Sequence, residues 1–259
     1  MNIMNKFIIL LFSLVSLHTY AQKKKNYTEK VDEVTFDMIY VKGGEFQMGD
    51  RKGDLVLDTG ENPSLPLHNV KISGFFVGKF EVTQNLWETV MGKNPSETKM
   101  GNLPVETVSW NDCQEFIKKL NTLTGKDYRL LTEAEWEYVA RGGKKHSDEE
   151  TGNVNITDRA WILDNSEGKL NAVGSKQPNE LGIYDLQGNV WEWVNDWYAV
   201  DSYKKTLSDD PQGVQNGKHK VYRGGSYMSE EEFCRPAYRN YDEPQIKQSF
   251  IGLRLARSL

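Results

Sequence analysis

Hydrophobic and polar residues alternate at two places in the first third of the chain, and this pattern predicts strands. The stretch "FDMIYVKGGEFQMGD" alternates along Phe36–Tyr40, and Gly43-Gly44 predicts a turn, so we expect a hairpin there. The stretch "HNVKISGFFVGKFEVT" alternates along Val70–Ile72 and predicts another strand. Between them, "DRKGDLVLDTGENPSLPLH" is rich in turn residues and predicts a long loop.

Apolar residues at helical spacing predict three helices, "QNLWETVMG", "WNDCQEFIKKLNTLTG" and "EAEWEYVARGG". Each is preceded by a residue that can cap a helix, and two have the acid three positions on that makes a capping box. These start signals are Thr83, Ser109 with Asp112, and Thr132 with Glu135. The large aromatic side chains of the second and third helices, Trp110, Trp136 and Tyr138, are interpreted as core residues.

The rest of the chain consists of short apolar pieces separated by Gly, Asn and Asp, and no repeat of fixed period is present. Long loops and few regular strands in one chain of this length favour a single irregular domain, ordered by unusual packing or by a bound ion. The fold class that we expect is therefore α+β and loop-rich.

The N-terminus has the pattern of a secretory signal peptide. Lys6 precedes an apolar run, Phe7–Val15, and small residues up to Ala21 lead into a polar stretch. We expect residues 1–21 to be the signal peptide, residues 22–34 a flexible segment and residues 35–259 one domain.

The export signal and the rest of the sequence place limits on localisation. The apolar run is too short to span a bilayer and no later run is longer, so no transmembrane segment is expected. The first cysteine is Cys113, which excludes a lipid anchor at the cleavage site. We expect a secreted protein of the periplasm or the cell surface.

Charge and cysteine content exclude one class of partner and leave one question open. The formal net charge is −5, and removal of Lys6 with the signal peptide makes it −6, so binding to nucleic acid has no electrostatic support. Cys113 and Cys234 could form a disulfide after export. Alternatively, Cys113 is a buried hydrophobic residue, because it lies at helical spacing with other apolar residues, and Cys234 is a single thiol.

The segment "NELGIYDLQGNVWEWVNDWY" has two interpretations. Asp185 and Glu192 flank Gly188, and a hard cation such as calcium takes carboxylate and carbonyl oxygens together. In the alternative, Asp185 caps a turn and Glu192 pairs with an arginine. The spacing favours the second interpretation, since it lacks the dense acids of an EF-hand loop.

Several motifs resemble the formylglycine-generating enzyme family, also called sulfatase-modifying factor domains. They are "GGEFQMGD", "KFEVTQNLW", "LPVETVSWNDCQEF", "YRLLTEAEWEYVARGG", "GIYDLQGNVWEWVNDWY", "VYRGGSY" and "IGLRLAR", in family order. The resemblance implies one domain distantly similar to C-type lectins. It also implies one structural calcium ion, which reverses the preference above, with the side chains of Asp185 and Glu192 and the carbonyls of Gly188 and Val190 as ligands.

The resemblance also locates the family's active site. In catalytic members two cysteines follow the Gly-Gly-Ser turn, and their thiolates bind the copper that activates oxygen. Counting from Ser226, the first position is Ser229 and the second is Cys234. A serine cannot replace a soft thiolate, so copper and catalysis at Ser226, Ser229 and Cys234 are not expected. The chain also reaches Arg239 sooner than catalytic members do, which leaves the match at Cys234 open.

Two classes of function follow. The first is a noncatalytic, calcium-stabilised platform that binds a protein, or alternatively a glycan, in an envelope assembly such as export or gliding machinery. Its surface would be the loop Tyr227–Gln248 with Trp197, Tyr198 and Tyr203. The second is an oxidase that generates formylglycine or a near variant, with Cys234 as its sole reactive thiol. A histidine-held iron site is not expected, because no H-x-x-x-H spacing occurs.

Overall fold

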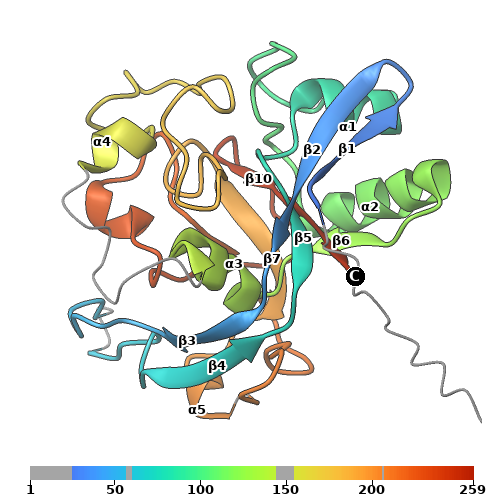
Figure 1. Cartoon of the computed structure of the whole chain (residues 1–259). Coiled ribbons are helices and arrows are strands. Elements are labelled where there is room, and N and C mark those ends of the chain that lie inside the picture. Colours follow the sequence, from blue (N-terminus) through green and yellow to red (C-terminus); the bar gives the residue numbers. More distant parts are fainter. Residues whose placement is uncertain (1–24, 57–59, 144–154, 206) are drawn as a thin grey trace, which may run out of the picture.

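A computed structural model describes residues 25–56, 60–143, 155–205 and 207–259. These residues form three sheets and a few short helices, joined by long loops (Figure 1). One sheet is antiparallel, in the order β1 (Tyr27–Val31), β2 (Val34–Val41), β5 (Phe75–Gly78), β11 (Leu255–Ser258), β6 (Tyr128–Leu130). The second is mixed, in the order β10 (Ile251–Leu253), β7 (Trp191–Trp197), β8 (Lys220–Arg223), β9 (Asn240–Asp242). The third pairs β3 (Gly44–Met48) with β4 (His68–Ile72). The expected α+β, loop-rich fold is confirmed.

The predicted hairpin at Gly43-Gly44 is wrong, because β2 and β3 do not pair with each other. Val41 lies opposite Phe75, and Gly44 lies opposite Ile72, so β2 and β3 together form one arm of a longer bent ribbon. A Cβ atom at Gly43 would lie 2.3 Å from the carbonyl oxygen of Ile72, which explains why glycine stands at the bend. The predicted long loop after β3 is the true turn of this ribbon.

The expectation of a flexible segment over residues 22–34 is wrong for its second half. Tyr27–Val31 forms β1, which pairs along its whole length with β2, and Tyr27 packs edge-on against Phe76 at 5.0 Å. The polar composition of this segment is typical of an edge strand with one exposed face. The predicted signal peptide, residues 1–21, lies outside the described residues.

All three predicted helices are confirmed, with the predicted caps. Both capping boxes are formed, and the first two helices end at left-handed glycines, Gly92 and Gly125. The helices are α1 (Gln84–Met91), α2 (Trp110–Thr124) and α3 (Glu133–Ala140), with the shorter α4 (Ile156–Arg159), α5 (Ser202–Lys205) and the 3-10 helix η2 (Glu231–Cys234).

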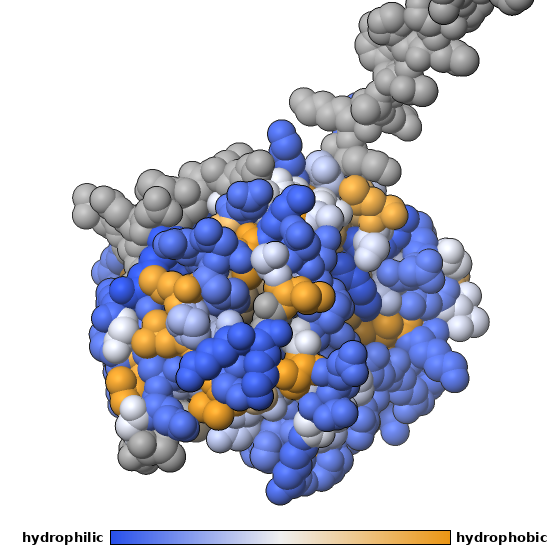
Figure 2. All heavy atoms as spheres, turned by 90° about the horizontal axis from the view of Figure 1, so that it is seen from below, coloured by the Kyte–Doolittle hydropathy of each residue, from blue (hydrophilic) through white to orange (hydrophobic). Residues whose placement is uncertain are grey.

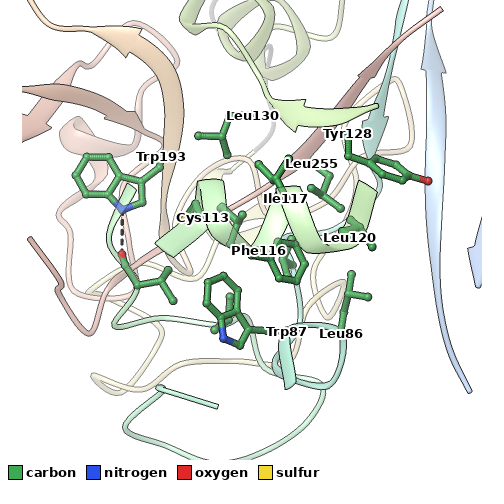
Figure 3. Close-up of a cluster of buried hydrophobic side chains, with 14 of the residues drawn as sticks. Leu86, Trp87, Cys113, Phe116, Ile117, Leu120, Tyr128, Leu130, Trp193 and Leu255 are labelled. Carbon is green, nitrogen blue, oxygen red and sulfur yellow. Dashed lines mark hydrogen bonds between the residues drawn. The ribbon is translucent and has the colours of Figure 1, made fainter. Parts of the chain in front are cut away.

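A core lies between α1, α2 and the first sheet (Figure 3). Trp87 of α1 stacks on Phe116 of α2 at 4.8 Å, and the indole nitrogen of Trp193 donates to the carbonyl of Val108 at 3.0 Å. Cys113 is fully buried there, as its helical spacing predicted. Trp136 and Tyr138 are also core residues, whereas Trp110 is half-buried.

A second core surrounds α3, which lies between β7 and the β3–β4 ribbon (Figure 1). Glu137 of α3 accepts a hydrogen bond from Arg223 at 2.6 Å and another from Arg141 at 2.9 Å. Glu133 accepts one from Arg239 at 2.6 Å. Because Arg223 ends β8, these buried ion pairs fix the point at which the Gly-Gly-Ser turn begins.

On the face shown in Figure 2, hydrophobic side chains form small spots among hydrophilic ones. Among the described residues, no helix combines the length and apolar character needed to cross a membrane.

Candidate functional site

The turn that follows β8 is built on two glycines with left-handed backbone angles, Gly224 (φ 105°) and Gly225 (φ 78°). A Cβ atom at Gly224 would lie 3.0 Å from the ring of Trp136, and one at Gly225 would lie 2.2 Å from the sulfur of Cys234. Only glycine combines this conformation with this approach. The turn therefore packs directly on Cys234.

Ser226 and Ser229 are held together by the turn. The backbone amide of Ser226 donates to the Ser229 hydroxyl oxygen at 3.0 Å, and the two hydroxyl oxygens lie 3.1 Å apart. The amide of Ser229 donates in return to the carbonyl of Ser226 at 2.9 Å. The Ser229 side chain thus closes a turn, and both serines are buried.

Cys234 lies beside these serines at the end of η2. Its thiol is fully buried next to Ala160 and Ile162, and it faces the backbone amides of Gly188 and Ser226. Burial raises the pKa of the thiol to about 12, and the charge of Glu231 adds a smaller increase. Since Ser229 and Cys234 meet at the amide of Ser226, the structure places them as neighbours.

The two cysteines are free and occupy separate clusters of buried side chains. Burial also raises the pKa of the Cys113 thiol well above its ordinary value. The structure therefore agrees with the second alternative, in which Cys113 is a buried hydrophobic residue and forms no disulfide.

Asp185 is buried and has one unsatisfied oxygen. Its Oδ2 accepts from the amide of Gly174 at 2.6 Å, whereas its Oδ1 is buried without a hydrogen-bond partner. Burial is the largest cause that raises the pKa of Asp185, to about 6, and the charge of Glu192 adds to it. A buried carboxylate oxygen without a hydrogen-bond partner is suited to be a cation ligand.

Glu192 pairs with an arginine, as the second interpretation of this segment predicted. Arg254 donates to both carboxylate oxygens, with the shortest distance 2.7 Å, and the indole nitrogen of Trp136 donates at 2.8 Å. These bonds occupy most of the acceptor capacity of the carboxylate. No local pattern identifies Arg254 as the partner, because it lies 62 residues away in the chain.

A third buried carboxyl group, Glu81, was missed by the sequence interpretation. Its oxygens accept from Asn189 Nδ2 at 2.8 Å and from the amide of Val190 at 3.1 Å. Burial, followed by the charges of Asp185 and Glu192, raises its pKa well above the ordinary value. The signal available was an acid in the apolar stretch "KFEVT", immediately before a helix cap.

Glu81, Asp185, Glu192 and Arg254 interact electrostatically, so three carboxyl groups share one guanidinium. Within this group, Oδ1 of Asp185 is an oxygen that is available to a hard cation. Gly188 has the left-handed conformation (φ 76°) that a turn around an ion requires. In the described part of the chain, no group of three or more His, Cys, Asp or Glu side chains has a metal-binding arrangement. An ion at this site would therefore need backbone carbonyls as ligands.

A cleft of about 570 Å³ lies beside the Gly-Gly-Ser turn. Two acids, Glu97 and Glu106, stand on one side, and Tyr227 stands at the turn. The backbone carbonyl of Tyr227 accepts from the Ser166 hydroxyl at 2.6 Å, which ties the turn to the segment opposite. The lining residues are Glu97, Thr98, Met100, Leu103, Glu106, Gly168, Lys169, Leu170, Asn171, Ala172, Tyr227 and Ser249.

The aromatic surface predicted around Trp197, Tyr198 and Tyr203 is formed only in part. Tyr203 is buried, because the guanidinium of Arg239 lies over its ring at 4.4 Å, and it is not available to a partner. Trp197 and Tyr198 are half-buried, and Tyr198 stacks on the exposed Tyr241 at 3.7 Å. Within the loop Tyr227–Gln248, Met228 is 53% exposed.

Comparison with known proteins gives consistent matches. Residues 23–259 match the sequence profile of the Sulfatase-modifying factor enzyme 1-like domain. The chain is 29% identical to the chaperone protein LppX of Paenibacillus barcinonensis, over 87% of this chain and 90% of that protein. It is 34% identical to the formylglycine-generating enzyme of Streptomyces coelicolor, over 66% of this chain and 57% of that enzyme.

A solved structure has the same fold. The Treponema denticola variable protein 1 superposes with a TM-score of 0.80 and 29% identity, covering 90% of this chain and 99% of that one. The likeness thus extends over nearly the whole length of both chains.

Proposed function

The chain belongs to the sulfatase-modifying factor family, and from this premise we propose that it is a noncatalytic, exported member that binds a protein partner. The observation that carries the proposal is the pair formed by Ser229 and Cys234. The family's copper chemistry needs two thiolates, and here one position is a hydroxyl that closes a turn. The residues therefore do not fit copper.

The remaining thiol supports the same conclusion. A cysteine reacts as its thiolate, and reactive cysteines are at least partly exposed and have a lowered pKa. Cys234 is fully buried and has a raised pKa. Neither an incoming substrate nor a metal reaches its sulfur without movement of the turn.

The cleft beside the turn is the surface that best suits a partner. Two exposed hydrophobic residues lie at the turn next to it: Met228 follows the cleft residue Tyr227, and the amide of Leu163 donates to the carbonyl of Ser229. The lining of the cleft contains two acids, Glu97 and Glu106, and one base, Lys169, which gives it a formal charge of −1. We infer that it accepts a protein segment with apolar and basic side chains. The relative named a chaperone protein supports a protein partner.

Calcium is the second part of the proposal. Asp185 would supply a carboxylate, Gly188 and Val190 would supply carbonyls, and Glu192 would share its carboxylate with Arg254. The bound ion would offset the excess negative charge of this group and so stabilise the native state. The partnerless Oδ1 of Asp185 is the support for it.

An oxidase that forms formylglycine is the alternative. The retained turn Gly224–Ser226, the neighbouring Cys234 and the match to the Streptomyces coelicolor enzyme favour it. A glycan-binding role is a further alternative that rests on the half-buried aromatic surface alone.

The test is Cu(I) titration of the reduced protein, together with oxygen uptake in the presence of a C-x-P-x-R peptide. We expect that the protein neither binds copper stoichiometrically nor consumes oxygen with the peptide. Stoichiometric copper binding or turnover would overturn the noncatalytic assignment.

Crosslinking in cells that produce the protein, with and without Met228→Glu, tests the cleft. Met228→Glu is expected to lower the yield of one crosslinked protein, and Leu123→Glu, on the exposed face of α2, is expected to leave it unchanged. Binding on a glycan array would favour the glycan role instead.

A further inference from the structure

Asn189 stands between Gly188 and Val190, the two residues whose carbonyls would bind calcium, and is itself fully buried with a left-handed backbone (φ 57°). Its side-chain nitrogen donates to Glu81 at 2.8 Å, and its backbone amide donates to the carbonyl of Trp161 at 2.8 Å. A buried asparagine with this many bonds has little freedom to move independently of its neighbours.

The other polar groups of Asn189 reach the cleft. Its Oδ1 accepts from the amide of Asn171 at 3.1 Å, and its carbonyl accepts from the amide of Tyr227 at 2.9 Å. Asn171 and Tyr227 both line the cleft, on separate segments of the chain. One residue of the cation segment therefore bonds to two walls of the cleft.

Glu81 holds this arrangement from the opposite side. Its carboxylate accepts from the side chain of Asn189 and from the amide of Val190, so it fixes both the asparagine and the following peptide group. It lies between β5 and α1, outside the segment and outside the cleft. It contacts neither a partner nor an ion, which makes it a positioning residue.

We propose that Glu81 and Asn189 couple cation binding at the Asp185 segment to the shape of the cleft, so that calcium and the protein partner bind cooperatively. An ion that binds the carbonyls of Gly188 and Val190 fixes the chain on both sides of Asn189, and so restrains the Asn189 side chain and carbonyl that accept from Asn171 and Tyr227. Without the ion, Oδ1 of Asp185 stays buried without a partner and the segment loosens. By linkage, a partner that needs the fixed cleft raises calcium affinity by the same factor.

This inference rests on the calcium site of the proposed function. The experiment that tests it is amide-resolved hydrogen exchange of the full mature chain, with calcium alone as the probe and with a chelator as reference. Calcium is expected to slow exchange at Asn171 and Tyr227 by about tenfold. The amide of Gly92, at the end of α1 and away from both sites, is expected to stay unchanged.

Glu81→Gln supplies the second arm, because it keeps the shape of the side chain and removes one acceptor. We expect calcium affinity to fall about 10- to 100-fold and, at saturating calcium, the exchange response at Asn171 and Tyr227 to be lost. Glu88→Gln, on the exposed face of the adjacent α1, is the matched control and should behave as the wild type.

The outcomes separate the two proposals. Calcium binding with unchanged exchange at Asn171 and Tyr227 in the wild type would overturn the coupling and leave the calcium site intact. Absence of calcium binding would overturn both. The wild-type measurement alone decides whether calcium binding is coupled to the cleft, so the test remains valid even if Glu81→Gln does not fold.

Discussion

Ser229 and Cys234 converge on one hydrogen-bond donor, the backbone amide of Ser226. The five-residue spacing therefore places their side chains as neighbours even though the following loop is shorter than the family pattern. What separates this site from a two-thiolate site is the chemistry of a single atom, the oxygen of Ser229.

Ser229→Cys is expected to create a copper site. Two sulfurs would then stand at the amide of Ser226, and soft thiolates select copper in its reduced state. Titration with a Cu(I) competitor should show stoichiometric binding in the variant and none in the wild type. The control is Ser229→Cys combined with Cys234→Ser, which should again bind none. A Ser229→Cys protein that folds but does not bind Cu(I) would contradict the assignment of Cys234 to the second cysteine position of the family's copper site.

The native protein is expected to be inert to thiol reagents. Both cysteines are free and buried, and both have raised pKa values, so little thiolate is present or accessible at neutral pH. A colorimetric thiol assay should detect neither under native conditions and both in denaturant. Fast labelling of Cys234 in the folded chain would show that the turn opens and would revive the oxidase alternative.

Calcium is expected to raise the melting temperature through Asp185. Saturating calcium at about 100 times Kd contributes about 2.7 kcal/mol, which corresponds to about 5–10 °C in a chain of this size. Differential scanning calorimetry with calcium or chelator should show this shift in the wild type and lose it in Asp185→Asn. Asp164→Asn, which removes an exposed carboxylate nearby, serves as the control. Equal melting temperatures with and without calcium in the wild type would reject the site.

Local signals in the sequence predicted the helices but not the pairing of the strands. The caps Thr83, Ser109 and Thr132 act on amides within three residues of themselves, so the sequence window contains the whole interaction. The bend at Gly43 depends instead on Ile72, far along the chain, and glycine pairs are read as tight turns when that partner is unknown. The first strand was missed for the same reason.

In the candidate site, too, local motifs were predicted and distant partners were not. The segment from Asp185 to Glu192 and the positions of Ser229 and Cys234 were predicted from the motifs. The partners that decide their chemistry, Arg254 and Glu81, come from distant strands and turns, and no local spacing identifies them. Burial of Cys234, which determines its reactivity, likewise follows from packing against Gly225 and not from its own neighbours in sequence.

The ion pair between Arg223 and Glu137 is expected to be essential for stability. Neither side chain is exposed, and Glu137 also accepts from Arg141. Glu137→Gln removes the carboxylate that pairs with buried Arg141 and leaves buried Arg223 with only its longer contact to Glu133 at 3.1 Å, which should lower the free energy of unfolding by about 3–5 kcal/mol. Urea denaturation measures this. Glu33→Gln, which breaks the exposed pair with Lys30, should cost less than about 0.5 kcal/mol, and similar losses in both variants would contradict the argument.

Asp196 is expected to make stability fall as pH rises toward neutrality. Burial, followed by repulsion from Glu133, raises its pKa to about 7, although Arg239 partly opposes this. The native state therefore keeps a proton that the unfolded chain has lost, between about pH 4 and pH 7, and the stability that this contributes is lost as pH rises through the native pKa.

The test of this pH dependence compares Asp196→Asn with the wild type by urea denaturation at pH 5 and at pH 7.5. Asparagine stays neutral and its side-chain oxygen can still accept from the amide of Glu133, a bond of 2.8 Å in the wild type. The free energy of unfolding of the variant should increase relative to that of the wild type as pH rises. Lys220, whose pKa is lowered to about 8 mainly by burial, stays largely protonated over this window and does not reverse the trend. An equal change in both proteins would mean that Asp196 is ionised in the native state throughout.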